Sequence, residues 1–311
     1  MASLRARLAL LTPVVLWAAA FPAIRVGLDG LGPGGLAVLR LAVASLCLAV
    51  VAPFAGLRRP AARHLPLIAA AGLTGVTGYN LLLNWGEVTV PAGTASFIVV
   101  TNPIYSAVLA VALLRERLLR RQVIGAAVAL VGVAAITLLG NQGSAGIDSS
   151  ALIVVCAAIA FGVYHVVIKP LLRHYSGLEV TAYATWAGTL FLVPAAPSLL
   201  SDLPHADAEA LTAAVLLGVA PSALGYVSWA YAVARLPVTV ATSSLYLVPP
   251  IAVVVGFVWL GEVPQPVEIA GGLVAIAGVA YASGILHSRR GAPNPTSPNK
   301  NQKLENSRAR G

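Results

Sequence analysis

Long apolar stretches fill most of this chain, and charged residues interrupt them only at intervals. Charges or turn-forming residues bound ten such stretches, at 8–26, 35–55, 65–84, 91–114, 122–139, 150–168, 178–199, 209–234, 237–260 and 267–286. Each is close to the roughly 20 residues that a helix needs to cross a hydrocarbon core about 30 Å thick. Only 10% of the residues are charged and 58% are hydrophobic, whereas about 25% of the residues in a soluble domain are charged. The pattern predicts an all-α polytopic membrane protein with ten transmembrane helices.

The two ends of the chain are interpreted separately. The first stretch is longer than the roughly 7–15 apolar residues of a signal peptide and lacks a cleavage-site pattern, so we expect a retained helix. Residues 287–311 are polar, basic and rich in Pro, Asn and Ser. Such a composition lacks the apolar surface that a packed core needs. We therefore expect a disordered, basic cytoplasmic tail.

Basic residues are confined to alternate loops. All lysines and arginines except Arg25 and Arg40 fall in the terminal segments, in loops 56–64, 115–121 and 169–177, or at the hinge near 235. The intervening loops carry acids and no bases: Asp29, Glu87, Asp148, Asp202, Asp207 and Glu262. Short basic loops stay on the cytoplasmic side of a membrane. We expect a multi-pass protein of the bacterial cytoplasmic (inner) membrane with both termini cytoplasmic.

The chain also repeats itself. Sliding it by 146 residues superposes 85–134 on 231–280. The informative matches pair Pro91 with Pro237, Pro103 with Pro249, Glu116 with Glu262, Gly125 with Gly271 and Gly132 with Gly278. Each half would hold five helices, an odd number, so the second half enters the membrane from the opposite side. Inverted repeats occur in secondary transporters, whose substrate site lies where the halves meet. The shared glutamate is expected to cap or pin the turn into the next helix.

A proline, a leucine, a glutamate and two glycines keep one spacing in both halves. The two sets are Pro103, Leu114, Glu116, Gly125 and Gly132, and Pro249, Leu260, Glu262, Gly271 and Gly278. With the opening VLWAAAFPAIR, this pattern resembles the EamA family of the drug/metabolite transporter superfamily. The longer opening VLWAAAFPAIRVGLDGLGPGG is similar to the amino-acid exporter branch. The resemblance implies two inverted five-helix EamA repeats at 1–139 and 150–286, a linker loop at 140–149, and a central cavity for export or exchange of small metabolites.

Motifs of other functions are absent or misplaced. Residues 30–35 match G-x-G-x-x-G, but they join two predicted membrane helices instead of a strand and a helix, which argues against nucleotide binding. The five histidines are scattered without the paired spacing of a zinc site. The basic residues do not form a patch interleaved with aromatic residues, as nucleic-acid-binding proteins do. We expect no catalytic residues, no metal or cofactor, no nucleic-acid partner and no enzyme activity.

Charged groups in the predicted spans are few. All acids lie in loops, in the tail or near helix ends, whereas proton relays and sites for lipophilic cations use a carboxylate inside the membrane. We therefore expect transport down the substrate gradient instead of a proton-driven cation pump. A basic group costs about 2.5–3.5 kcal/mol at a helix centre on insertion scales. Arg25 and Arg40 could reach lipid headgroups, or they could contact an anionic substrate group such as a carboxylate.

Aromatic and amide side chains recur at helical spacing on several predicted helices. Polar side chains in hydrocarbon face the bundle interior or a wet cavity. We predict a substrate-binding site formed by Trp17, Phe21, Arg25, Tyr79, Asn80, Asn102, Tyr105, Tyr164, His165, Trp186, Tyr226, Trp229, Ser243 and Tyr246. Hydrogen bonds between helices and an interfacial aromatic belt are the competing interpretations. Pro103 and Pro249 are candidates for hinges or static kinks.

These observations favour a secondary transporter that exports or exchanges a small metabolite, with an amino acid as the preferred candidate, by alternating access. Alternative substrates are a nucleoside, a vitamin or a drug-like compound. A membrane-embedded enzyme acting on lipids is a weaker alternative, since such enzymes need clustered acids or a metal site. The expected partners are the small-molecule substrate and the lipid bilayer, with the chain as a monomer or weak homodimer.

Overall fold

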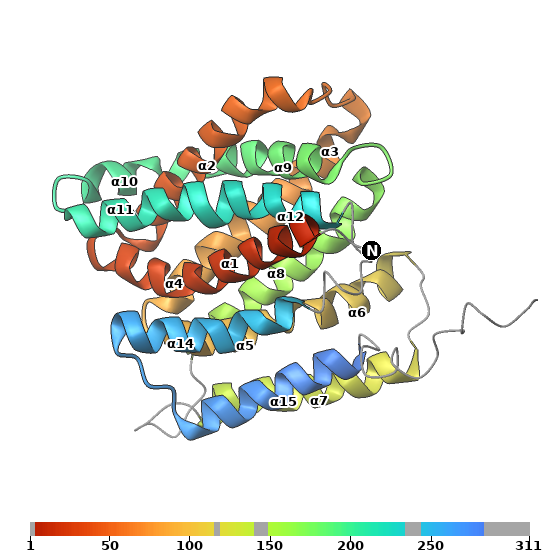
Figure 1. Cartoon of the computed structure of the whole chain (residues 1–311), viewed down its shortest axis with the longest axis vertical. Helices are drawn as coiled ribbons and strands as arrows, with labels where there is room; N and C mark the ends of the chain where they lie inside the picture. The colour runs from red at the N-terminus through yellow and green to blue at the C-terminus, as the bar shows by residue number, and fades with distance from the viewer. Residues whose placement is uncertain (1–3, 115–118, 140–148, 234–243, 283–311) are drawn as a thin grey trace, which may run out of the picture.

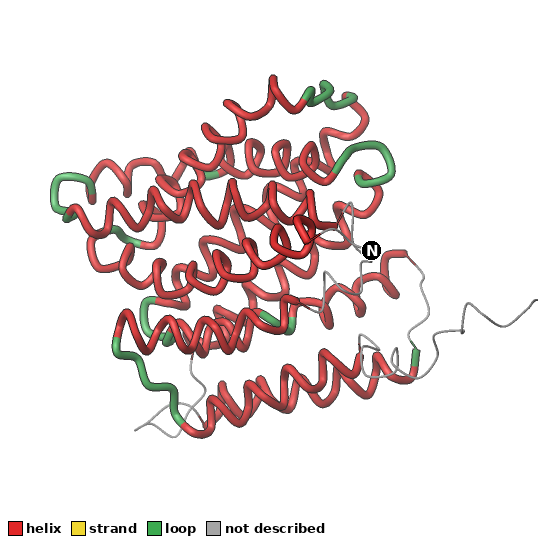
Figure 2. The backbone as a smooth tube through the Cα atoms, viewed as in Figure 1, coloured by secondary structure: helices red, strands yellow, loops and turns green. Residues whose placement is uncertain are grey.

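The computed structural model describes residues 4–114, 119–139, 149–233 and 244–282. All regular structure in these ranges is helical, and the connections are short (Figure 2). The described part of the first half contains α1 (Leu4–Gly30), α2 (Pro33–Ala55), η1 (Ala62–His64), α3 (Leu65–Ala71), η2 (Gly72–Gly78), α4 (Tyr79–Glu87), α5 (Ala92–Val99), α6 (Asn102–Leu114) and α7 (Arg120–Leu139). The second half contains α8 (Ser149–Leu171), α9 (Gly177–Phe191), η3 (Val193–Ala195), α10 (Ala196–Asp202), α11 (Ala208–Leu217), η4 (Gly218–Leu224), α12 (Gly225–Val233), η5 (Leu245–Leu247), α14 (Val248–Leu260) and α15 (Pro266–Ala282).

The chain is a polytopic membrane protein. Among the described residues, six helical stretches are long and apolar enough to cross a bilayer, and the bent pair at Gly177–Phe191 and Val193–Asp202 could supply a seventh. Leu245–Leu260 and Pro266–Ala282 are shorter apolar helices. Large apolar side chains face outward, including Phe54 at 87% exposure and Val258 at 77%. Such a surface suits lipid and not water.

Several stretches that the sequence predicts as continuous helices contain breaks. The stretches at 65–84 and 209–234 each include a π-helical segment, η2 and η4. The stretch at 91–114 divides between α5 and α6 just before Pro103. The reason is local: Pro221 in η4 has no N–H to donate, and the glycines of η2 weaken a regular helix. Backbone groups freed in this way need other partners, which a neighbouring helix or a cavity can supply.

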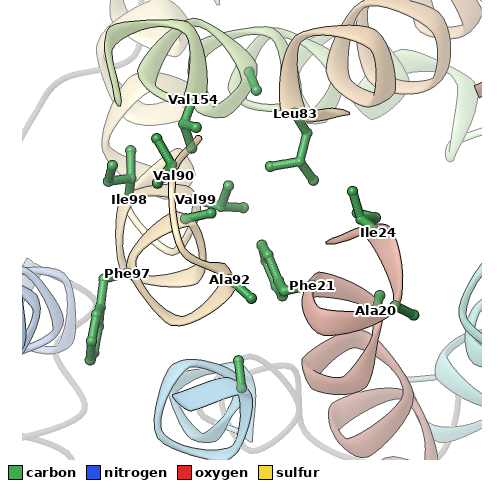
Figure 3. Packing of buried hydrophobic residues seen from close by; sticks show 14 of the residues in the cluster. Ala20, Phe21, Ile24, Leu83, Val90, Ala92, Phe97, Ile98, Val99 and Val154 are labelled. Carbon is green, nitrogen blue, oxygen red and sulfur yellow. The ribbon is translucent and has the colours of Figure 1, made fainter. Parts of the chain in front are cut away.

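Helix α1 runs through the centre of the bundle. It packs against α11, α12 and α14 of the second half and against α5 of the first (Figure 1). Figure 3 shows the core beside it, where Phe21 of α1 and Leu83 of α4 lie near Val99 of α5. Because α1 contacts both halves, its side chains are placed to line any space between them.

Helices α7 and α15 form a separate layer at one edge of the molecule (Figure 1). Their close contact depends on glycines that the sequence matches between the halves. A Cβ atom on Gly125 would lie 2.5 Å from the carbonyl oxygen of Gly278, and one on Gly132 would lie 2.6 Å from the backbone nitrogen of Ala275. The small residues on these two faces allow the helices to pack closely, as such faces do in membrane proteins.

Loops of opposite charge lie at opposite ends of the bundle (Figure 1). At one end, the basic loop after α2 is held by Arg58, whose Nε lies 2.9 Å from Glu179 Oε1. This hydrogen bond and the charge of Glu179 raise the pKa of the Arg58 guanidinium. Glu179 also forms a capping box with Ser176 at the start of α9. At the other end, Asp202 accepts a hydrogen bond from the Gly32 amide at 2.9 Å.

Packing of α7 on α15 predicts a large effect from one added methyl group. Gly132→Ala should lower the free energy of unfolding by about 1–3 kcal/mol, because the new Cβ would overlap the backbone of α15. Val131→Leu on the same helix is the control, because Val131 is 65% exposed. Thermal unfolding in detergent measures both variants, and equal melting temperatures would contradict this account of the packing.

Candidate substrate cavity

A cavity lies inside the bundle where helices from both halves meet. Its interior of about 130 Å³ is roughly ten times what one water molecule needs. Its lining residues are Trp17, Phe21, Arg40, Leu41, Gly75, Val76, Tyr79, Asn80, Ser96, Val99, Val100, Asn102, Phe161, Tyr164, Thr181, Thr185, Pro221, Ser222, Tyr226, Leu245 and Val248. They come from helices α1, α2, α4–α6, α8, α9, α12 and α14, from the segments η2, η4 and η5, and from the turn between α5 and α6.

Aromatic rings form two walls of this cavity. The Trp17 and Tyr226 rings lie 5.4 Å apart between centroids. On the other wall the Tyr79 and Phe161 rings stack at 4.6 Å, and the Phe161 ring is parallel to the Tyr164 ring at 5.7 Å. Aromatic faces bind apolar and unsaturated groups through large, rigid contact surfaces. The cavity therefore offers a clear site for the apolar part of a small solute.

Carbonyl groups of the two π segments hold two side chains of the lining in place. In η2, the Val76 carbonyl accepts a hydrogen bond from Asn80 Nδ2 at 2.7 Å, which leaves Asn80 Oδ1 buried with no donor among the described residues. In η4, the Pro221 carbonyl accepts from Trp17 Nε1 at 3.0 Å. The breaks in helical regularity thus orient side chains that line the cavity. Irregular turns of this kind are frequent at functional sites.

The structure brings half of the predicted site residues together. Trp17, Phe21, Tyr79, Asn80, Asn102, Tyr164 and Tyr226 line the cavity. Arg25, Tyr105, His165, Trp186, Trp229 and Tyr246 do not belong to its lining. Ser243 falls outside the described residues.

The residues outside the lining have other contacts. Trp229 lies behind Trp17, with ring centroids 5.4 Å apart, and Trp186 Nε1 donates to Ser45 O at 3.1 Å. The exposed His165 ring meets the edge of the Phe161 ring at 4.6 Å. Tyr246 donates its hydroxyl to Val279 O at 3.3 Å. Tyr105 packs against Gly162 of α8.

Sequence reasoning did not place several lining residues in the site. These are Arg40, Ser96, Phe161, Thr181, Thr185 and Ser222. Phe161 corresponds to Trp17 when the halves are aligned near their starts, and Thr181 and Thr185 share one helical face. The match of Phe161 with Trp17 and the shared face of the two threonines could both have indicated cavity residues. The sequence indicated a cavity position for Arg40 less clearly, because its depth in α2 allowed contact with a headgroup as readily as contact with the cavity.

Pro103 and Pro249 occupy the same place in their helices. Pro103 is the second residue of α6, and Pro249 is the second residue of α14. Each follows an interruption: α5 ends at Val99, and η5 precedes α14. Whether they act as hinges or as static kinks stays a prediction.

At the acidic end of the bundle, Arg25 and Glu262 join the two halves. Arg25 Nε lies 3.2 Å from Glu262 Oε1, and Glu262 Oε2 accepts a hydrogen bond from the Ala92 amide at 2.8 Å, at the start of α5. Arg25 also donates to the carbonyl oxygens of Glu87 and Val88. Glu262 therefore caps α5 of the other half, whereas the repeat predicted a cap or a pin for the turn into the next helix. The Glu87 side chain, which the sequence places in an outer loop, is fully buried.

The cavity offers little for metal or acid–base chemistry. Among the described residues, no three His, Cys, Asp or Glu side chains gather where they could hold a metal ion. Neither aspartate nor glutamate lines the cavity within this part of the chain. The arrangement is suited to binding and release of a small solute.

Comparisons with known proteins point to transport. Residues 4–138 and 148–284 each match the model of the EamA-like transporter family. A relative from Streptantibioticus cattleyicolor, named a probable terminal-alkyne amino-acid exporter, is 53% identical over 92% of this chain and 96% of its own length. The uncharacterized transporter YdfC of Bacillus subtilis is 33% identical over 86% of this chain and 87% of its own. A probable amino-acid metabolite efflux pump of Salmonella typhimurium is 27% identical over 86% and 90%.

A solved crystal structure has the same fold. It superposes on 94% of this chain and 100% of its own with a TM-score of 0.61, at 20% sequence identity. At this identity the likeness concerns the fold alone.

The contacts of Glu262 predict a graded loss of stability. Glu262→Ala removes both the partner of Arg25 and the cap of α5, and hydrogen bonds to charged groups contribute about 1.5–3 kcal/mol each. Glu262→Gln keeps an acceptor for the Ala92 amide and should lose less. Asp29→Asn, at an exposed acid of the same end, is the control. If all three variants unfold at one temperature in detergent, Glu262 does not join the halves as described.

Proposed function

Because the chain belongs to the EamA-like transporter family, we propose that it exports or exchanges a small amino acid or amino-acid metabolite by alternating access through the central cavity. It is a membrane transporter, and its curated relatives carry the names of transporters, exporters or efflux pumps. An export role for amino acids follows the names of two of these relatives.

The main observation in support of this proposal is the cavity between the halves. Its aromatic rings suit a compact apolar or unsaturated side chain, and the polar side chains of the lining, among them Arg40 and Asn80, suit the charged ends of an amino acid. The relative from Streptantibioticus cattleyicolor is named for amino acids with a terminal alkyne. A terminal alkyne is slim, apolar and unsaturated, and it would pack against the aromatic rings that line the cavity. We therefore propose such amino acids as the first substrates to test.

We further propose ten membrane-spanning helices in two inverted repeats, at 1–139 and 150–286. The shift that aligns Pro103 with Pro249 also aligns both ends of α6 with those of α14 and η2 with η4. The family model matches the chain twice. Helices α6 and α14 end on opposite sides of the bundle (Figure 1), as inversion requires.

The charged loops support a membrane orientation. Within the described residues, the basic turns after α2 and α8 lie at one end of the bundle, and the acidic turns after α10 and α14 lie at the other (Figure 1). This arrangement favours both termini in the cytoplasm by the positive-inside rule. The proposed location is the cytoplasmic membrane of a bacterium, with the chain as a monomer or weak homodimer. Export of a nucleoside, a vitamin or a drug-like compound is the alternative substrate proposal.

Counterflow in proteoliposomes tests the substrate class. Vesicles loaded with unlabelled propargylglycine should accumulate the labelled compound transiently and saturably. Asn80→Ala should raise the KM about threefold to tenfold, the effect of one neutral hydrogen bond. Trp85→Phe, at a side chain 57% exposed on the outside of the bundle, should leave the KM unchanged. If no amino acid shows counterflow and a nucleoside or vitamin does, the amino-acid proposal is wrong and its alternative is supported.

An imposed proton gradient should not drive net accumulation. The described lining of the cavity holds no carboxylate that could carry a proton with the substrate, and proton relays in transporters generally need one. Uptake of labelled propargylglycine into vesicles with equal and with unequal pH across the membrane measures this. Accumulation above the external concentration, abolished by a protonophore, would refute downhill transport.

A further inference from the structure

Arg40 places a cation inside a membrane-spanning helix, at the eighth of its 23 residues. It lies well inside α2 (Pro33–Ala55), its residue is only 7% exposed, and it lines the central cavity. Its Nε donates to Ser222 Oγ at 3.2 Å, and the Ser222 hydroxyl donates in turn to Leu217 O at 2.8 Å. Ser222 therefore fixes the direction of the guanidinium without contributing a negative charge.

The charge of Arg40 is not balanced by contact with an acid. Two other arginines, Arg25 and Arg58, each form an ion pair with a glutamate. Within the described part of the chain, Arg40 forms none, and its buried Nη1 has no acceptor. The Glu87 carboxylate is buried as well, but neither of its oxygens receives a hydrogen bond from the described residues. It therefore gives Arg40 no direct partner.

Such an arrangement is unfavourable unless something supplies the missing anion. A buried charge without a partner destabilises a fold, and apolar residues of similar volume in its place are often neutral or stabilising. If Arg40 served only to hold α2 against η4, one neutral hydrogen bond would be enough. A glutamine could also make that bond. The planar guanidinium adds two parallel N–H donors that match a carboxylate in geometry and in charge.

The rest of the cavity complements a molecule that carries both charges. Asn80 Oδ1 is a buried acceptor with no donor among the described residues, and it suits an ammonium group. The Tyr79 and Phe161 rings stack beside it and would cover an apolar side chain. Since no acid lines the described cavity, a solute with only a positive charge would meet the repulsion of Arg40 with no carboxylate to offset it.

We propose that Arg40 binds the carboxylate of the transported solute, so that the cavity selects zwitterions with a free carboxylate over amides, amines and cations. This rests on the proposed function, in which the cavity is the transport path. Arg40 then serves as the specificity-determining residue of the site, and Asn80 accepts a hydrogen bond from the ammonium group.

Matched pairs of competitors test the proposal in proteoliposomes. Propargylglycine, leucine and phenylalanine compete for counterflow of labelled propargylglycine, each beside its carboxamide, which lacks the negative charge. The wild-type protein should bind each acid about 10- to 100-fold more tightly than its amide, the range for one hydrogen-bonded charge. Arg40→Gln should reduce this ratio to about threefold or less. Arg63→Gln, the same change at an exposed arginine outside the cavity, should keep the wild-type ratio.

A stability measurement separates binding from a structural role. Arg40→Met should unfold in detergent at the same temperature as the wild-type protein or higher, because it removes an unpaired buried charge, and it should lose the preference for acids. A lower melting temperature together with an unchanged acid-to-amide ratio would show that Arg40 is only a tether. Arg40→Lys keeps the charge and should retain part of the preference.

The outcomes also separate this proposal from the proposed function. If amino acids are transported and their amides compete equally well in the wild-type protein, the role of Arg40 is refuted and amino-acid transport stands. If no amino acid is transported, the proposed substrate class fails. The role of Arg40 is then tested by comparing how much benzoate and benzamide each raise the melting temperature of the protein. Stabilisation by benzoate alone, lost in Arg40→Gln, supports carboxylate binding, and equal effects of both compounds refute it.

Discussion

Backbone hydrogen bonding inside a bilayer is the constraint on which this structure depends. Where a helix faces lipid, each N–H and C=O must be paired within the helix, because no water can replace a missing partner. The irregular segments η2 and η4 can exist only where other groups accept or donate in their place. Trp17 meets this need for the Pro221 carbonyl, and Asn80 does so for the Val76 carbonyl. The same deviations that require protein partners therefore position the side chains of the cavity.

The polar groups of the interior are few, and each has a distinct setting. Arg25 and Glu262 neutralise each other near one end of the bundle, where their exposed fractions of 31% and 18% allow contact with water or headgroups. Arg40 lies deeper and lacks such a partner. The two arginines, on neighbouring helices, therefore have different roles. Arg25 joins elements of the fold, whereas the charge of Arg40 stays available inside the cavity.

Much of the fold could be predicted from the sequence because the bilayer makes composition informative. Every predicted apolar stretch contains helix within the described residues. The paired glycines matched α7 with α15 in the repeat, but they did not show that the two helices pack against each other. The cavity was harder to predict. Helical spacing shows that Trp17 and Trp229 can each face the bundle interior, but it does not show that Trp229 lies behind Trp17. Glu87 looked like a loop residue because its neighbours along the chain are polar or turn-forming, whereas helices distant in sequence bury it. Side-chain depth depends on these tertiary neighbours, which periodicity does not encode.

The connection at the acidic end limits how the two halves can move. Glu262, in the turn between α14 and α15, binds Arg25 of α1 and the first amide of α5 with its two carboxylate oxygens. A rocking motion that separates α14 from α1 and α5 at this end must break both contacts together. The freed amide, carboxylate and guanidinium would then need water or headgroups as partners, which are present only near the membrane surface. Because this connection lies close to an end of the bundle instead of in its centre, water or headgroups can offset part of the cost of breaking it.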